Sequence, residues 1–202
     1  MRNRILKYHL EIFTAFVFLF TIVNALLFRH LSDARKFINL FLLLGVLHEW
    51  EEKRYPGGFF DLMAKKFNMN FSQEVLDRAG CFVIIYWLFV TLIPYAFDQL
   101  VFLLLIPVVL NIFEAFIHTM GIVIHQLKKP YTPGMVSGWI MAISSVAVVA
   151  YLERNALVSA SDYVLGVVLM FGTFILMDVA IFRAAGMCLS DMKQKISQQR
   201  KK

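Results

Sequence analysis

Apolar and polar residues are gathered in separate blocks along the chain. Six stretches are predominantly apolar, and each is near the ~20 residues that an α-helix needs to cross the hydrocarbon core of a bilayer. Polar turns, some of them marked by Pro or Gly, separate the stretches. The pattern predicts an all-α, polytopic integral-membrane bundle of about six transmembrane helices, at residues 10–28, 37–56, 80–97, 99–124, 134–152 and 163–186.

The blocks form one domain over residues 1–190, followed by a basic tail at 191–202. The first block has a basic start but no small-residue cleavage site after it, so we interpret it as a transmembrane helix and not as a signal peptide. The longest connection lies between the second and third blocks. It contains the sequence FFDLMAKKF, whose aromatic and basic residues predict a short amphipathic helix at the membrane surface.

Composition and charge agree with a membrane protein. The chain is 59% hydrophobic, against ~45–50% for a soluble domain. The net charge of +6 is unevenly distributed: with six spans and a cytoplasmic N-terminus, 16 of the 20 Lys and Arg residues fall on the cytoplasmic side. This positive-inside bias predicts that both termini are cytoplasmic. The basic character therefore indicates topology and contact with membrane lipids, and we expect no nucleic-acid partner.

The second block ends in an unusual polar sequence, LHEWEEK. His48, Glu51 and Glu52 stand at i, i+3 and i+4, a spacing that stacks side chains on one helix face. A charged group at the centre of a bilayer costs ~2.5–3.5 kcal/mol on insertion scales. Such residues persist where they are paired, hydrated or bound to a metal ion.

The fourth block carries a second polar stripe in the sequence NIFEAFIHTMGIVIH. Asn111, Glu114, His118 and His125 lie at positions 0, +3, +7 and +14. In the predicted topology the second and fourth helices both run toward the cytoplasm. Counted from Phe37 and Leu100, Glu51 and Glu114 each lie 14 residues along their block, or roughly 21 Å along a helix. We therefore expect the two stripes to meet in the inner third of the bilayer.

Imidazole and carboxylate groups at one depth are typical ligands of zinc, iron or manganese. Three carboxylates are more than one tetrahedral ion usually takes, which favours a pair of ions ~3.5–4 Å apart. A simpler interpretation is an ion pair of His48 with Glu52 and a solvated rim in which Glu51 meets Lys53 or Arg54. The metal hypothesis takes as ligands His48, Glu51, Glu52, Glu114 and His118.

Other polar residues are candidates for supporting roles. His125 lies seven residues beyond His118, or ~10 Å along a straight helix, so it joins the ligands only if the helix bends; otherwise it faces the substrate or transfers protons as a catalytic residue. Asn111 and Tyr131 are placed to orient ligands or line the mouth of the site. Asp178, inside the last apolar block, either pairs with Arg183 or supports the site.

Three elements of the sequence resemble a known family. HEWEE at residues 48–52 matches an HxxEE signature, NIFEAFIH at 111–118 matches NxxExxxH, and YTPG at 131–134 matches YxPG. Together they are similar to the HXXEE domain family of bacterial membrane proteins, over roughly residues 40–140. The resemblance implies a membrane enzyme of unassigned chemistry, located in the bacterial inner (plasma) membrane. It also implies functional roles for six residues, which are His48, Glu51, Glu52, Asn111, Glu114 and His118.

These features predict a metal-dependent membrane enzyme acting on a lipid or another amphiphile, by metal-activated water and with Glu51 or Glu52 as general base. One alternative is a di-iron oxidoreductase, a hydroxylase or desaturase, which would need a separate redox partner. Another is a transporter or binder of metal ions or protons. The apolar outer halves of the second and fourth blocks argue against a path across the bilayer.

Overall fold

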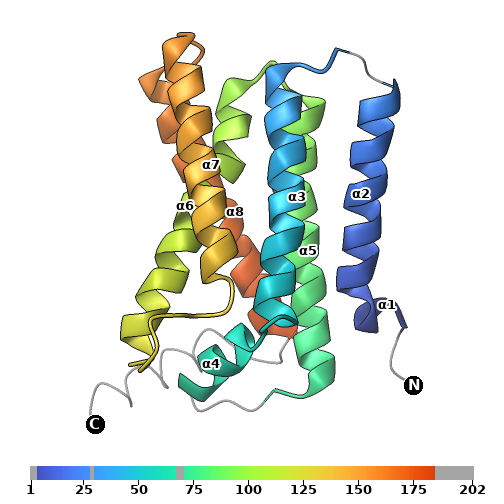
Figure 1. Cartoon of the computed structure of the whole chain (residues 1–202), viewed down its shortest axis with the longest axis vertical. Helices are drawn as coiled ribbons and strands as arrows, with labels where there is room; N and C mark the ends of the chain where they lie inside the picture. Colours follow the sequence, from blue (N-terminus) through green and yellow to red (C-terminus); the bar gives the residue numbers. More distant parts are fainter. Residues whose placement is uncertain (1–3, 28–29, 67–70, 185–202) are drawn as a thin grey trace.

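The computed structural model describes residues 4–27, 30–66 and 71–184, and within them every regular element is an α-helix. Six long helices alternate in direction, so that α3, α6 and α8 run opposite to α2, α5 and α7 (Figure 1). The predicted all-α bundle is confirmed. The helices are α1 (Arg4–Lys7), α2 (His9–Leu27), α3 (Asp33–Lys53), α4 (Phe59–Lys66), α5 (Gln73–Ala96), α6 (Val101–Ile124), α7 (Met135–Arg154) and α8 (Ala160–Ala184).

Five of these helices, α2, α5, α6, α7 and α8, are long and apolar enough to cross a membrane. This number indicates a membrane protein. The remaining predicted span, the second block, corresponds to α3. This helix has 21 residues but contains more Asp, Glu, Lys and Arg than a membrane span usually carries. Despite its polarity, α3 contacts α2, α5, α6 and α7. Its polar side chains are therefore turned largely into the bundle, where other helices shield them from lipid.

Several helix boundaries differ from the predicted ones because capping residues extend the helices beyond the apolar blocks. The helix α5 begins seven residues before the predicted position 80, since the Ser72 hydroxyl accepts a hydrogen bond from the Val75 N–H. Ser32 caps α3 in the same way, through the Arg35 N–H. At its other end α3 stops at Lys53, three residues before the predicted position 56, and the YPGG turn follows.

One end of the bundle gathers the start of α2, the end of α3, the turn between α6 and α7, and the end of α8 (Figure 1). The predicted short helix after the second block is α4, and it crosses this end beneath the long helices (Figure 1). The position of α4 at the membrane surface remains a prediction. The basic tail predicted at 191–202 lies outside the described residues.

Close packing of α6 against α7 sets the position of the α6–α7 turn. Gly138 on α7 faces Ala115 on α6, and a Cβ added to the glycine would lie 3.4 Å from the Ala115 backbone. Asn111, fully buried on α6, donates a hydrogen bond to the Ser145 hydroxyl on α7 at 3.0 Å. Small residues and an interhelical hydrogen bond are common means of association between membrane helices. Together these contacts hold the start of α7 beside the polar stripe of α6.

Candidate metal centre

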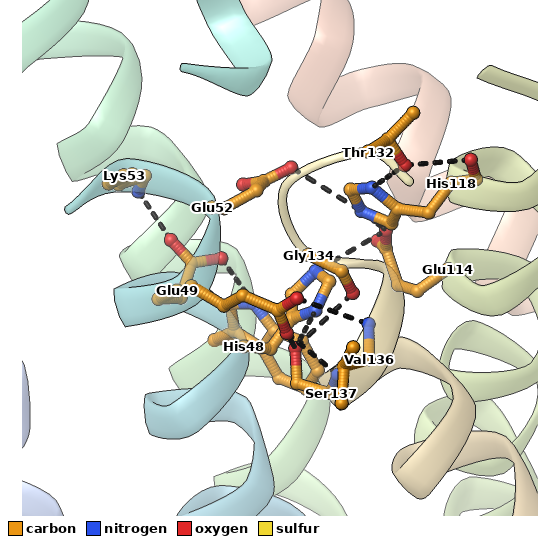
Figure 2. Close-up of polar contacts among 12 residues, drawn as sticks. His48, Glu49, Glu52, Lys53, Glu114, His118, Thr132, Gly134, Val136 and Ser137 are labelled. Carbon is orange, nitrogen blue, oxygen red and sulfur yellow. Dashed lines mark hydrogen bonds and ion pairs between the residues drawn. The ribbon is translucent and has the colours of Figure 1, made fainter. Parts of the chain in front are cut away.

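Two histidines and two glutamates converge from α3 and α6 at the end of the bundle that α4 crosses (Figure 2). His48 and Glu52 are one turn apart on α3, and Glu114 and His118 are one turn apart on α6, so each pair projects from one helix face. The His118 Nε2 atom lies 3.6 Å from Glu52 Oε1 and 3.6 Å from Glu114 Oε2. His48 Nε2 lies 3.7 Å from Glu114 Oε2. The structure thus joins the two stripes.

The spacing of these atoms suits a bound cation. The N–O distances of 3.6 and 3.7 Å exceed those of hydrogen bonds. They are close to the roughly 3.4 Å that separates two ligands each ~2.1 Å from a tetrahedral ion. Single ligand atoms of His48, Glu52 and His118 all lie within 4.8 Å of one another, the one such group of three or more among the described residues. His118 Nε2 is buried and has no hydrogen-bond partner, which is uncommon for a buried polar atom.

The far side of the His48 ring is oriented by α7. Its Nδ1 lies 3.1 Å from the Ser137 hydroxyl, and this hydroxyl donates to Glu51 Oε2 at 2.5 Å. A hydroxyl has one proton, so Ser137 accepts from the Nδ1–H of the imidazole. This arrangement selects the tautomer whose Nε2 lone pair faces Glu114. A hydrogen bond to the nitrogen that does not bind the ion is the usual support of a histidine ligand.

The α6–α7 turn supports the His118 ring. The Thr132 hydroxyl donates to the His118 carbonyl oxygen at 2.8 Å and lies 3.5 Å from Nδ1 of the same residue. Gly134 has a φ of +93°, and a Cβ there would lie 2.5 Å from His118 Cε1. The Phe59 ring of α4 lies 4.4 Å from the imidazole, measured between centroids. The ring therefore contacts both the turn and α4.

Glu51 lies outside this group, because its carboxylate is turned to the N-terminus of α7. It accepts hydrogen bonds from the backbone N–H of Val136 at 3.1 Å and of Ser137 at 2.7 Å, and from the Tyr131 hydroxyl at 2.8 Å. A carboxylate is favoured at a helix N-terminus, where backbone N–H groups have no helical partner. Burial, and then the bond to Glu51, raise the pKa of Tyr131 above its ordinary value. Metal ligation or base catalysis by Glu51 remains a prediction.

Thr132, Gly134 and Ser137 are site residues that the helix spacings did not single out. All three lie in the sequence YTPGMVSG at 131–138, which follows α6 after residues 125–130. The sequence feature that could have identified them is a turn rich in small and hydroxyl residues next to a helix with predicted metal ligands. The turn packs on the α6 histidine, and Ser137, in the first turn of α7, contacts the α3 histidine.

Glu49 is a further buried residue to which the sequence pattern assigned no role. It points away from the metal centre, as its helix position predicts, but it is buried with 1% of its surface exposed. Its Oε1 accepts a hydrogen bond from Trp87 Nε1 at 2.9 Å, and Oε2 forms an ion pair with Lys53 (Figure 2). Arg54 pairs with Glu11 at 3.1 Å. The solvated rim considered above, with Glu51 beside Lys53 or Arg54, is therefore not the arrangement found.

The remaining predicted site residues lie further out. Asn111 is buried between α6 and α7. His125 forms the C-cap of α6 and is not part of the candidate metal group. Asp178 is partly buried on α8 and makes no ion pair with Arg183 in the described part of the chain. The roles predicted for Asn111, His125 and Asp178 remain predictions.

Comparison with known proteins adds one finding. A family described as proteins of unknown function with an HXXEE motif matches residues 39–149. The matched interval is more than half of the chain and extends from α3 into α7, so it contains all four converging residues and the α6–α7 turn. No curated protein and no solved structure matches the chain.

Proposed function

The chain belongs to the HXXEE family, and we propose that it is a metal-dependent integral-membrane enzyme acting on a lipid or another amphiphile. The observation that carries the proposal is the donor set of the candidate metal centre. Ligand atoms of His48, Glu52 and His118 lie within 4.8 Å of one another, and Glu114 Oε2 lies 3.6 to 3.7 Å from both Nε2 atoms. The His118 Nε2 atom is buried without a hydrogen-bond partner. Zinc, iron and manganese are the ions that such nitrogen and oxygen donors suit.

We place the site at the cytoplasmic face of a bacterial inner membrane. The end of the bundle that holds the centre contains the segments with most Lys and Arg residues, and such segments face the cytoplasm. The amphipathic α4 crosses the same end, as a helix in the interfacial region does. A substrate partly dissolved in the inner leaflet reaches a site at this depth.

Each ligand has a defined role in the proposed reaction. His48 and His118 would hold an ion through Nε2 and Glu52 through one carboxylate oxygen; Glu114, whose Oε2 lies 3.6 to 3.7 Å from both Nε2 atoms, would be the fourth ligand, and a water would be the fifth. A bound divalent ion lowers the pKa of a coordinated water to about 7 and polarises a carbonyl or phosphoryl oxygen. The Glu52 oxygen turned away from His118 would be the base for such a water. The Glu114 side chain, 17% exposed, lies where a reactant meets the ion.

One ion agrees better with this arrangement than two. The carboxylate predicted to bridge a second ion, Glu51, already accepts three hydrogen bonds from donors of α7 and one from Tyr131. This favours metal-activated water over the di-iron alternative. The transporter alternative needs polar groups along α6 toward its start, but the buried residues there are apolar, namely Leu104, Leu105, Ile106, Val108 and Leu110.

Elemental analysis of the protein purified in detergent tests the proposal. We expect near-stoichiometric zinc, iron or manganese, and its loss in the double variant Glu52→Ala with His118→Ala. The matched control is Glu74→Ala with His30→Ala, which removes the same two residue types from exposed positions and should retain the metal. Equal metal content in the two double variants, or none in the parent protein, would refute the proposal. Two ions per chain would restore the di-iron alternative.

A further inference from the structure

The Glu51 carboxylate uses its full hydrogen-bonding capacity on the start of α7 and the turn before it. Its Oε1 accepts from the Tyr131 hydroxyl at 2.8 Å and from the Val136 N–H at 3.1 Å. Its Oε2 accepts from the N–H and the hydroxyl of Ser137, at 2.7 and 2.5 Å. A carboxylate accepts about four hydrogen bonds, so Glu51 has no lone pair left for an ion or for a proton from water. The next residue, Glu52, instead lines a cavity of about 390 Å³ at the same end of the bundle.

The bonds made by Glu51 supply the N-cap that α7 lacks. The N-cap residue of this helix is Gly134, which makes no side-chain capping bond. Val136 and Ser137 are the second and third residues of α7, and the N–H groups at these positions are those that a Ser, Thr, Asp or Asn N-cap normally binds. Glu51 binds both of them from α3, and its negative charge is favoured at the N-terminal end of a helix.

Only a carboxylate satisfies both N–H groups. One oxygen of Glu51 faces the N–H of Val136 and the other faces the N–H of Ser137, so both atoms must be acceptors. A glutamine of the same shape would place its NH₂ group, which is a donor, against one of these N–H groups in either orientation of the amide. The position therefore requires the two equivalent acceptors of glutamate.

The segment that Glu51 binds is the one that contacts both histidines of the metal centre. The Ser137 hydroxyl lies 3.1 Å from His48 Nδ1, and a Cβ added to Gly134 would lie 2.5 Å from His118 Cε1. The Ser137 hydroxyl also lies 3.2 Å from the Gly134 carbonyl oxygen. The shorter contact and the charge of the carboxylate favour Glu51 as the acceptor of its proton, which leaves the hydroxyl oxygen to accept from His48.

We propose that Glu51 is a positioning residue of the metal centre, in place of the ligand or base that its spacing predicted. As a cap supplied by α3, it fixes the first turn of α7, and through that turn it holds the two imidazoles toward the ion. The presence of an ion rests on the proposed function, whereas the cap and the orientation of the His48 ring do not. The HxxEE and YxPG elements of the sequence therefore meet at this carboxylate.

Glu51→Gln tests the cap in metal-free protein purified in detergent. We expect amide hydrogen exchange at Val136 and Ser137 to be roughly fivefold faster than in the parent, as for the loss of an N-cap. The Nδ1–H resonance of His48, observed by NMR of protein labelled with ¹⁵N-histidine, should disappear because this proton exchanges faster with water. The matched control Glu74→Gln, whose partner is a surface arginine, should change neither signal. If Glu51→Gln does not fold, Tyr131→Phe retains both backbone bonds and should accelerate the same amide exchange about threefold.

Zinc-loaded protein distinguishes positioning from ligation. Glu51→Gln should lower zinc affinity about 10–100-fold in chelator competition, yet X-ray absorption at saturating zinc should show the same imidazole and oxygen ligands as the parent. Glu52→Ala, which removes a proposed ligand, should change this shell. Unchanged amide exchange, unchanged zinc affinity, or an oxygen ligand missing from saturated Glu51→Gln would each overturn the proposal. A parent protein that binds no metal refutes the proposed function, and the exchange and NMR measurements then decide whether Glu51 caps α7 and orients His48.

Discussion

Replacing Gly134 by alanine tests the support of the metal centre most directly. At this position φ is +93°, and the new Cβ would lie 2.5 Å from His118 Cε1 and 2.8 Å from Nε2. The left-handed conformation costs an L-residue roughly 1–2 kcal/mol. In addition, carbon atoms in contact lie ~3.5–4.0 Å apart, so the imidazole or the turn must move by about 1 Å.

A displacement of this size is large for a metal ligand. A zinc–nitrogen bond is ~2.0–2.1 Å long, so a ring displaced by half that length cannot keep its bond while the other ligands stay in place. Loss of groups that orient a ligand typically costs 10–100-fold in metal affinity. We expect Gly134→Ala to weaken metal binding by at least this factor.

The matched control is Gly58→Ala. Gly58 has a φ of +95°, but a Cβ there would meet nothing within 4 Å. Both variants therefore carry comparable backbone strain, and only one of them presses on His118. Metal affinity is measured by competition with a chelator and elemental analysis, and stability by thermal unfolding in detergent. Equal metal affinity in the two variants would show that the Gly134 contact does not position a ligand, and the reasoning would fail.

Two further predictions concern the surroundings of the centre. Ser137→Ala removes the hydroxyl that lies between His48 and Glu51, so metal affinity, measured by chelator competition, should fall about 10-fold or more. The control is Ser144→Ala, whose hydroxyl donates to a carbonyl of its own helix and whose loss should leave metal affinity unchanged. Equal losses of affinity in the two variants would contradict the role of Ser137. Glu49→Gln removes the ion-pair partner of Lys53, whose side chain is 10% exposed, and should cost ~3–5 kcal/mol of unfolding free energy. Denaturant titration should show ~0–1 kcal/mol for Glu74→Gln, whose partner is a surface arginine; a similar small loss for Glu49→Gln would count against a buried pair.

Much of the fold could be predicted from the order of apolar and polar residues. A chain in lipid must satisfy its backbone hydrogen bonds internally, so stretches of ~20 apolar residues become helices. The helical period then placed His48 with Glu52 and Glu114 with His118 on two faces. The common direction of α3 and α6 followed from counting spans, and the structure has it. Each of these inferences depends only on local geometry and on the bilayer as solvent.

The different environments of Glu51 and Glu52 could not be predicted from the sequence. Spacing put both on the face of His48, yet only Glu52 points to α6, while Glu51 is bound by the first N–H groups of α7. The turn that starts α7 at Met135 decides between them, and no periodicity within α3 contains this information. For the same reason the buried pair of Glu49 and Lys53 could not be distinguished from a solvated one before the position of α5 was known.

By itself, then, the sequence determined that the chain forms membrane-crossing helices and that imidazole and carboxylate groups share helix faces, because period and length are properties of one segment at a time. Only the tertiary structure decided which carboxylates join the histidines, which His48 tautomer faces the centre and which cavity adjoins Glu52. Those outcomes depend on side chains from several helices meeting within a few ångströms, and a change of one turn in any of the packed helices would have produced a different set.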